Sequence, residues 1–109
     1  MQAEELSNML SITNLAAQPV YDQGAPPLIV AVRIEADVVH VGDAPIQEPF
    51  VLTWRLVDDQ NDTVGQTSRR LEGNMEPGEV RRVTLTVEFE ARESVAGLRN
   101  VATFDPVSG

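Results

Sequence analysis

A strict alternation of apolar and polar residues constrains this chain more than any other feature. It is clearest over residues 83–90, where the two classes swap at every step. Because successive side chains of a β-strand point to opposite faces, this pattern places Val83, Leu85, Val87 and Phe89 on one side. We therefore expect a strand with one buried face and one solvent-exposed face.

Two other segments show the same period of two. Residues 50–57 direct one row of large apolar side chains inward: Phe50, Leu52, Trp54 and Leu56. Residues 28–37 are rich in β-branched residues and direct a second row inward: Leu28, Val30, Val32, Ile34 and Ala36. The parity slips over residues 38–41, which predicts a bulge or a strand that changes sheet there.

Turn-forming residues separate these segments at the spacing of an all-β domain. They lie at residues 42–45, 59–62 and 76–79, and weaker strands are expected at 11–15, 63–71 and 98–104. Connections this short join antiparallel neighbours, because a parallel crossover needs a dozen or more residues. The fold class predicted is all-β, a single antiparallel β-sandwich of about seven strands. Its expected core is Val30, Val32, Ile34, Leu52, Trp54, Leu56, Leu71, Val83, Leu85, Val87, Phe89 and Phe104.

The start of the chain is the one segment with helical spacing. Leu6, Met9 and Leu10 recur at that spacing within residues 3–10, which indicates a short helix. Standing at a terminus, it is expected to fray or to dock against a partner. A chain of 109 residues holds one domain. The predicted organisation is an N-terminal segment (1–10), the sandwich domain (11–105) and a C-terminal tail (106–109).

Two passages resemble a known class of β-sandwich. Residues 52–59, which run into a polar turn and then Val64-Gly65, resemble the middle hairpin of immunoglobulin-like and fibronectin type III-like domains. Residues 71–79, followed by the strand at 83–87, are similar to a passage of bacterial Ig-like adhesion-type modules. The resemblance to a bacterial or viral Ig-like module implies an Ig-like sandwich architecture and no functional residue. The cysteine pair of antibody domains is absent, and the sole tyrosine, Tyr21, does not stand at a tyrosine corner.

Charge and composition exclude several classes of function. The net charge is -9, all eight basic residues are arginines, and there is no cysteine. An acidic, lysine-free surface argues against nucleic acid and anionic membranes as partners. The longest apolar run, residues 28–32, is far below the ~20 residues that span a bilayer, and Glu4 and Glu5 stand where a signal peptide is basic. A location in a virion or in the cytoplasm is expected.

Two clusters carry side chains that are typical of chemical sites. His40 has Asp37 and Asp43 nearby in sequence, as a general base would, but no nucleophile motif accompanies it. We interpret it as a strand-end histidine beside a turn. The oxygen-rich loop Asp58–Asp62 has the ligand type of a calcium loop but lacks its glycine and its trailing glutamate, so calcium binding there is left open.

Other conspicuous residues have structural interpretations. Arg69-Arg70 and Arg81-Arg82 are expected on a solvated face, paired with carboxylates such as Glu88 or Glu90, with an acidic protein partner as the alternative. The parity of Trp54 makes it a core residue rather than a ligand platform. Pro26-Pro27 is interpreted as a linker or as an element that interrupts an edge strand.

We thus predict no catalytic, cofactor-binding or metal-ligating residue, no cofactor, and a protein that is not an enzyme. The favoured function is a structural or protein-interaction module, a subunit of a larger assembly such as a virion or tail component. Its partners would be other protein subunits, a second copy of the chain included, met through an edge strand or the terminal segments. The alternative is a small domain that binds a carbohydrate, a peptide or Ca²⁺ with loops Gly42–Glu48 and Asp58–Thr63 at its mouth.

Overall fold

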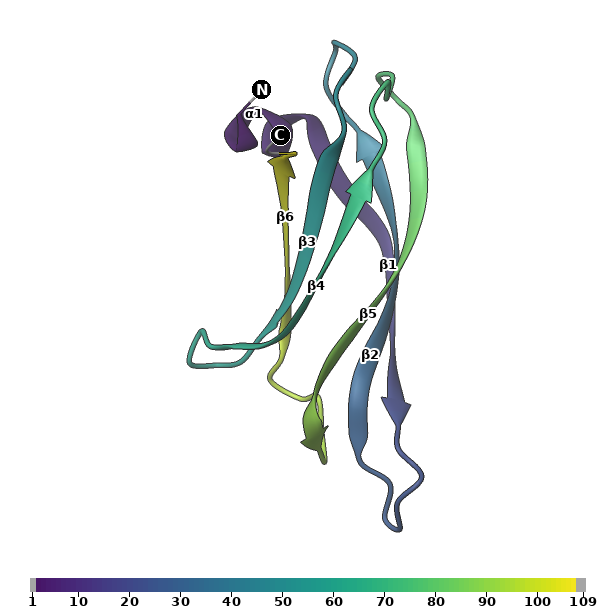
Figure 1. Ribbon diagram of the computed structural model, residues 1–109, viewed down its shortest axis with the longest axis vertical. Coiled ribbons are helices and arrows are strands. Elements are labelled where there is room, and N and C mark those ends of the chain that lie inside the picture. The colour runs from purple at the N-terminus through teal and green to yellow at the C-terminus, as the bar shows by residue number, and fades with distance from the viewer. Residues whose placement is uncertain (1, 108–109) are drawn as a thin grey trace.

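The computed structural model describes residues 2–107 and is an elongated two-layer β-sandwich, 51 × 24 × 24 Å in extent (Figure 1). Its elements, in order, are α1 (Ala3–Met9), β1 (Leu10–Tyr21), β2 (Ile29–His40), β3 (Phe50–Val57), β4 (Thr63–Leu71), β5 (Val80–Arg92) and β6 (Arg99–Pro106). One sheet has the order β1-β2-β5 and the other β4-β3-β6, and every pairing is antiparallel. The predicted all-β sandwich is confirmed, with six strands in the described residues rather than about seven.

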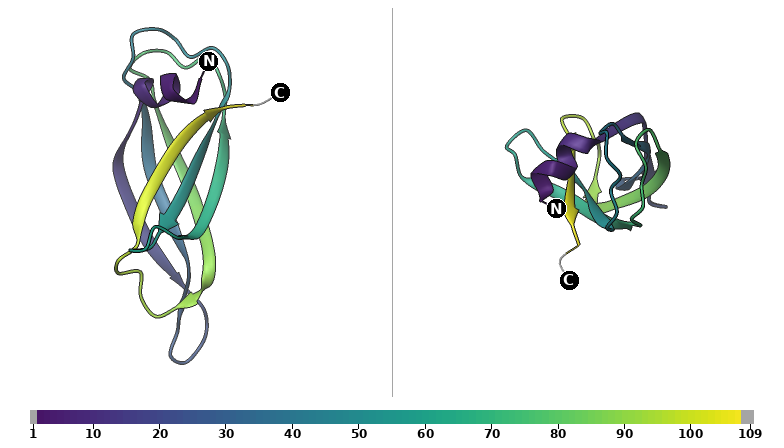
Figure 2. Two further views of the ribbon diagram at one scale, coloured as in Figure 1. Left: turned by 90° about the vertical axis from the view of Figure 1, so that its left-hand side faces the viewer. Right: turned by 90° about the horizontal axis from the view of Figure 1, so that it is seen from above.

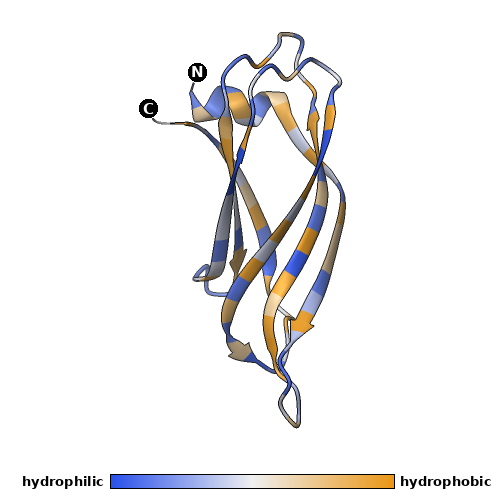
Figure 3. Cartoon of the chain, turned by 45° about the vertical axis from the view of Figure 1, so that its right-hand side comes forward, coloured by the Kyte–Doolittle hydropathy of each residue, from blue (hydrophilic) through white to orange (hydrophobic). Residues whose placement is uncertain are grey.

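The core lies between the two sheets and is built from the predicted alternation, which Figure 3 shows as orange and blue bands along the strands. All four inward residues of β3 are buried, as are Val83, Leu85 and Val87 of β5. Two residues assigned to the core, Val30 and Phe89, are only half-buried. They lie where the β2–β5 register is irregular, because Glu88 pairs with Ala31 and Arg92 pairs with Ile29. The additional residues of β5 turn the strand locally, which takes Phe89 partly out of the core.

The bulge expected in β2 lies in another strand. β2 keeps a regular register with β5 from Ala31 through Val39, and Ala36, Val38 and His40 are all buried. The slip predicted over residues 38–41 is therefore wrong. It was suggested by Val39 and Val41, which point outward although they are apolar. The irregularities of the β1–β2 pairing lie elsewhere, between Thr13 and Ala16 and between Val20 and Tyr21.

The N-terminal helix belongs to the core, contrary to the prediction that it frays or docks elsewhere. Leu6 is 1% exposed and joins the same hydrophobic cluster as Leu10. α1 lies across one end of the sandwich and contacts both β6 and β1 (Figure 2). The C-terminal boundary also shifts, because Pro106 still belongs to β6 and pairs with Phe50. Residues 108–109 of the predicted tail lie outside the described part.

The two long sides of the sandwich differ. On one side β4 and β5 contact each other across the sheets. A Cβ on Gly65 of β4 would lie 2.5 Å from the carbonyl oxygen of Glu88, so glycine permits this close approach. On the other side, β1 and β6 are the edge strands of their sheets, and among the described helices and strands α1 contacts both of them at one end. The sandwich is thus closed along β4–β5 and open along β1–β6. No helix in the part of the chain that the structure describes is both long and apolar enough to cross a membrane.

Candidate functional site

His40 is a buried structural residue whose ring closes the turn after β2. The backbone N–H of Gly42 donates to Nδ1 at 3.0 Å, and Nε2 lies 2.7 Å from the carbonyl oxygen of Ala44. This geometry requires Nε2 to carry the proton and donate it to the carbonyl. Both ring nitrogens are therefore occupied within the turn. The structural interpretation as a strand-end histidine agrees with this placement, although the side chain is buried rather than on the surface.

The loop Asp58–Asp62 uses its first carboxylate to hold its own backbone. Oδ1 of Asp58 accepts the N–H groups of Gln60 and Asp62, each at 2.9 Å. This arrangement is the Asx type of turn, in which an aspartate replaces a backbone acceptor. Within residues 2–107 no group of three His, Cys, Asp or Glu side chains is placed to hold a metal ion.

The two loops proposed as one binding mouth lie far apart. Loop Gly42–Glu48 precedes β3 and loop Asp58–Thr63 follows it, so the full length of this eight-residue strand separates them (Figure 1). At about 3.3 Å per residue that is roughly 26 Å. The prediction of a shared mouth is therefore wrong. The sequence already implied this separation, because the strand predicted at residues 50–57 lies between the two loops and loops at successive ends of a strand lie at opposite ends of a sandwich.

The paired arginines serve the fold, with partners other than those expected. Arg81 bonds Glu79 at 2.6 Å and also donates to the carbonyl oxygens of Glu72 and Gly73. Arg82 lies 3.3 Å from Asp37 and 3.5 Å from Glu35, and Arg33 lies 3.3 Å from Glu35. Arg69 crosses to the other sheet and donates to the carbonyl oxygen of Thr84 at 2.9 Å. These contacts match the solvated, salt-bridged face, but Glu88 and Glu90 are not the partners.

Three carboxylates have pKa values below the usual range because they accept hydrogen bonds. Backbone N–H groups of Leu28 and then Gly24 lower the pKa of Asp22. The Asn14 amide at 2.8 Å, followed by Arg82, lowers the pKa of Asp37. The N–H of Glu76 and then Arg81 lower the pKa of Glu79. Asn14 has φ 52° in the β1 bulge, so its bond to Asp37 anchors that bulge to β2.

These shifts predict that acid destabilises the protein. A carboxylate whose folded pKa lies below its unfolded value contributes stability that is complete above the unfolded value and is lost as pH falls through the folded one. For Asp37 the loss begins near its usual pKa of 3.8. We expect Asp37→Asn to flatten the fall of the urea midpoint below that pH. Equal pH curves for wild type and Asp37→Asn would contradict the assignment.

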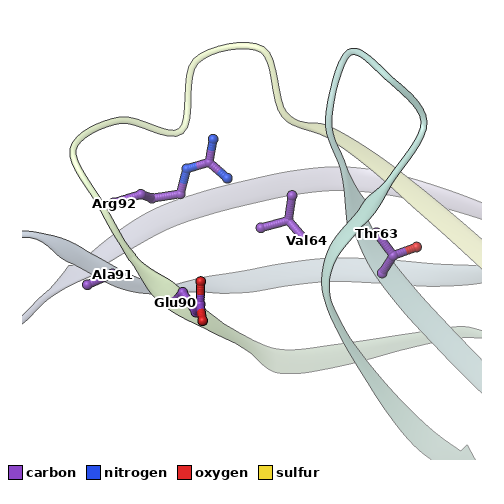
Figure 4. A pocket seen from close by; sticks show the side chains of 5 residues that line it. All are labelled: Thr63, Val64, Glu90, Ala91 and Arg92. Atoms are coloured by element: carbon purple, nitrogen blue, oxygen red, sulfur yellow. The ribbon is translucent and has the colours of Figure 1, made fainter.

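A hollow of about 380 Å³ lies where β4 begins and β5 ends. Its walls are Thr63, Val64, Glu90, Ala91 and Arg92. Its volume falls within the range of small-ligand sites, but such sites have polar groups that converge on the ligand. Figure 4 shows the five side chains spread around the hollow without a common focus. The guanidinium of Arg92 donates through Nε to the carbonyl oxygen of Ser94 at 2.9 Å.

The strongest candidate for a functional surface is β1, on the open side. Its last nine residues, Thr13–Tyr21, are all exposed. Three of the five exposed large hydrophobic side chains among the described residues belong to it: Leu15 (46%), Val20 (40%) and Tyr21 (54%). No charged residue occurs between Glu5 and Asp22. An exposed strand edge with these properties is a template for pairing with another strand.

The other three edge strands carry charges that discourage such pairing. β4 contains Arg69 and Arg70, β6 contains Arg99 and Asp105, and β5 is the most highly charged of the three. Natural sheets commonly protect an edge with charges, prolines or bulges. β1 has Pro19 and two register irregularities, between Thr13 and Ala16 and between Val20 and Tyr21. Because it carries no charge, its segment Ala16–Tyr21 is the least protected edge segment of the described fold.

A second hollow, of about 180 Å³, lies between the sheets on the same open side. It is lined by Ala17, Val32, Leu56, Val95, Leu98 and Asn100. Asn100 supplies a polar group there, and its Oδ1 accepts the indole N–H of Trp54 at 3.0 Å. The other five lining side chains are apolar. The open edge therefore combines an uncharged strand with an apolar recess beside it.

The sequence alone does not identify this surface. Its patterns favour docking through an edge strand or the termini, without distinguishing one strand from another. One signal was present in the sequence: sixteen residues without a charge, Leu6–Tyr21, in a chain that is 23% charged. Which strand forms an unpaired edge was not readable, because that depends on contacts between segments far apart in the chain.

Comparison with known proteins adds little to the site. No family model matches the chain, and no curated protein matches it. A solved structure with some likeness is that of an arabinose-bound α-L-arabinofuranosidase, with 10% sequence identity and a TM-score of 0.40 over 95% of this chain. This chain spans about a fifth of that protein, 21% of its length.

Proposed function

We propose that this protein is a non-enzymatic structural or protein-interaction module, a subunit of a larger protein assembly, and that it meets its partner through β1. The observation that carries the proposal is the exposed, uncharged edge of β1 beside an apolar recess. Its supporting context is that the other polar clusters are already engaged within the fold. His40, Asp58 and Arg82 each hold a turn or a strand pairing through their polar atoms.

The mode of binding that fits this edge is addition of a strand. A partner segment in extended conformation pairs its backbone with the free N–H and C=O groups of β1 and lengthens the sheet β1-β2-β5. Pro19 offers no N–H, so its contribution is limited to its carbonyl group. Leu15, Val20 and Tyr21 supply apolar contact at intervals along the strand.

The free energies of burial and of association predict binding of moderate strength. Complete burial of a side chain of this size contributes about 1.5–3 kcal/mol. These three side chains are already partly covered, so each contributes less than that. Association costs about 4–15 kcal/mol before any net affinity appears. Backbone pairing and the apolar recess must therefore supply the remainder, and micromolar affinity is the expected scale.

The test compares variants that place a charge on the edge with variants that place it elsewhere. The partner is the protein that co-purifies with the wild type. The double variant Leu15→Lys/Val20→Lys is expected to weaken its binding at least about tenfold, because a strand edge that carries lysines resists pairing. The matched control is Val41→Lys/Val80→Lys, two valines that are 58% and 55% exposed outside β1. Binding is measured by titration of each purified variant with the partner.

Thermal midpoints of both double variants must stay near that of the wild type for the comparison to be valid. The proposal predicts loss of binding for the β1 variant and retention for the control. Unchanged binding of the β1 variant, or equal loss in both variants, would remove β1 as the docking edge.

A further inference from the structure

We propose that the partner of β1 is a second copy of this chain. Ala16–Val20 of the two copies pair antiparallel about a two-fold axis that places Gln18 opposite Gln18 of the other copy, and the two sheets form a continuous six-stranded sheet. This inference rests on the proposed function, in which β1 is the docking edge. It adds the identity of the occupant and the symmetry of the contact.

The distribution of charge supports a second copy. Next to β1, the outer face of the sheet carries Arg33 and Arg82 against Glu35 and Asp37, which are joined by ion pairs of 3.3–3.5 Å. This group is neutral as a whole, and β1 itself has no charge. The remaining fifteen acidic and six arginine residues carry the whole net charge of -9. When two copies meet along β1, each therefore contributes a surface without net charge, although the whole chain is acidic.

A charged partner would be recognised by charges of opposite sign on β1, and β1 carries no charged residue. Two-fold pairing needs only a surface that is complementary to itself. In an antiparallel two-fold pair, each residue of the strand faces a fixed counterpart in the other copy. Since Leu10–Tyr21 contains no charged residue, no register of that pairing places like charges opposite each other.

The geometry of Ala16–Val20 suits such a pair. This segment pairs without interruption with β2 from Ala16–Glu35 to Val20–Ala31. It is five residues long, within the usual length of a strand. Ala16 and Ala17 have small side chains, which permit close approach of a second strand. Leu15 immediately precedes the segment and Val20 ends it, and both extend the apolar contact.

The experiment is sedimentation equilibrium of the wild type and of charge variants between about 1 μM and about 1 mM, the range in which a weak dimer is detected. The wild type is expected to approach twice its mass of 11.9 kDa with rising concentration. Gln18→Lys and Gln18→Glu, each alone, are expected to raise the dimer dissociation constant at least about tenfold, because like charges then face each other. An equimolar mixture of the two is expected to restore the dimer.

Gln66 provides a matched control on another edge strand. Gln18 pairs with Arg33 of β2, and Gln66 of β4 pairs with Arg55 of β3, so both glutamines are exposed and stand opposite an arginine. Gln66→Lys and Gln66→Glu are expected to leave the wild-type dissociation constant unchanged. A loss of the dimer in the Gln66 variants instead would place the contact on β4 and overturn the inference.

The two proposals fail in different ways. A wild type that stays at 11.9 kDa throughout the range overturns the self-pairing. If that monomer still binds another protein, and Leu15→Lys/Val20→Lys abolishes this binding, the proposed function stands with a different partner. A dimer that persists in Gln18→Lys and Gln18→Glu overturns the self-pairing as well, because the contact then does not involve β1.

Discussion

Replacing Trp54 with alanine is expected to lower the free energy of unfolding by about 3–5 kcal/mol. Trp54 is 1% exposed and is the largest of the fully buried side chains. Its removal leaves a cavity between the two sheets and ends the hydrogen bond from its indole to Asn100. Total stabilities of domains are about 5–15 kcal/mol, so the variant would retain little margin. The measurement is urea unfolding followed by circular dichroism, which does not need the tryptophan signal.

Tyr21→Ala is the matched control, since it also removes a large aromatic side chain. Tyr21 is 54% exposed at the end of β1, and its loss is expected to change the free energy of unfolding by less than about 0.5 kcal/mol. The account requires this contrast between the two aromatic residues. Comparable losses in Trp54→Ala and Tyr21→Ala would mean that Trp54 does not lie between the layers.

Replacing Leu6 with alanine is expected to cost about 2–5 kcal/mol, the range for a fully buried leucine. α1 has only seven residues, too few for a helix to be stable by itself, so its packing on the sandwich must hold it. Leu6 is the buried residue of α1 and joins the main hydrophobic cluster. The same urea measurement tests this expectation.

Asn8→Ala is the control for α1, because Asn8 is exposed on the same helix. It is expected to change the free energy of unfolding by less than about 0.5 kcal/mol. If Leu6→Ala has as small an effect as Asn8→Ala, the helix contributes nothing to the core. That result would favour the frayed or partner-docking segment that the sequence alone suggests.

Local alternation predicted the strands well, because it records burial directly. The inward row of β3 and three of the four inward residues predicted for β5 are buried, and the short connections correctly indicate antiparallel neighbours. Exceptions arise where burial does not follow parity. Val41 is apolar but points outward, and this break in the alternation led to the incorrect prediction of a bulge. Phe89 lies beside a register irregularity that no local pattern reveals.

Features that depend on distant contacts were not predictable in this way. Leu6 is buried because β6, a strand more than ninety residues later in the chain, passes beneath α1. The separation of loops Gly42–Glu48 and Asp58–Thr63 is a different case, because the predicted strand between them already implied it. His40 could be recognised as a turn histidine, but its two hydrogen bonds required the structure.

The candidate site was predictable from the sequence only in part. Its uncharged strand is visible in the sequence, whereas its position at an open edge is not. Exposure of Ala16–Tyr21 depends on β6 being the last strand of its own sheet and on α1 covering only one end of the gap. A single sequence gives the composition of every edge strand but not which strands become edges.

Hydrogen–deuterium exchange of β1 as a function of protein concentration tests the central claim most directly, because amide protection reports whether a strand edge is paired. The account predicts that those amides of Ala16–Tyr21 that point away from β2 exchange quickly in dilute solution and become protected as the concentration rises, while β3 is protected throughout. Strong protection of these outward amides in the dilute monomer, or their rapid exchange at every concentration, would contradict an open edge that pairs with a second copy.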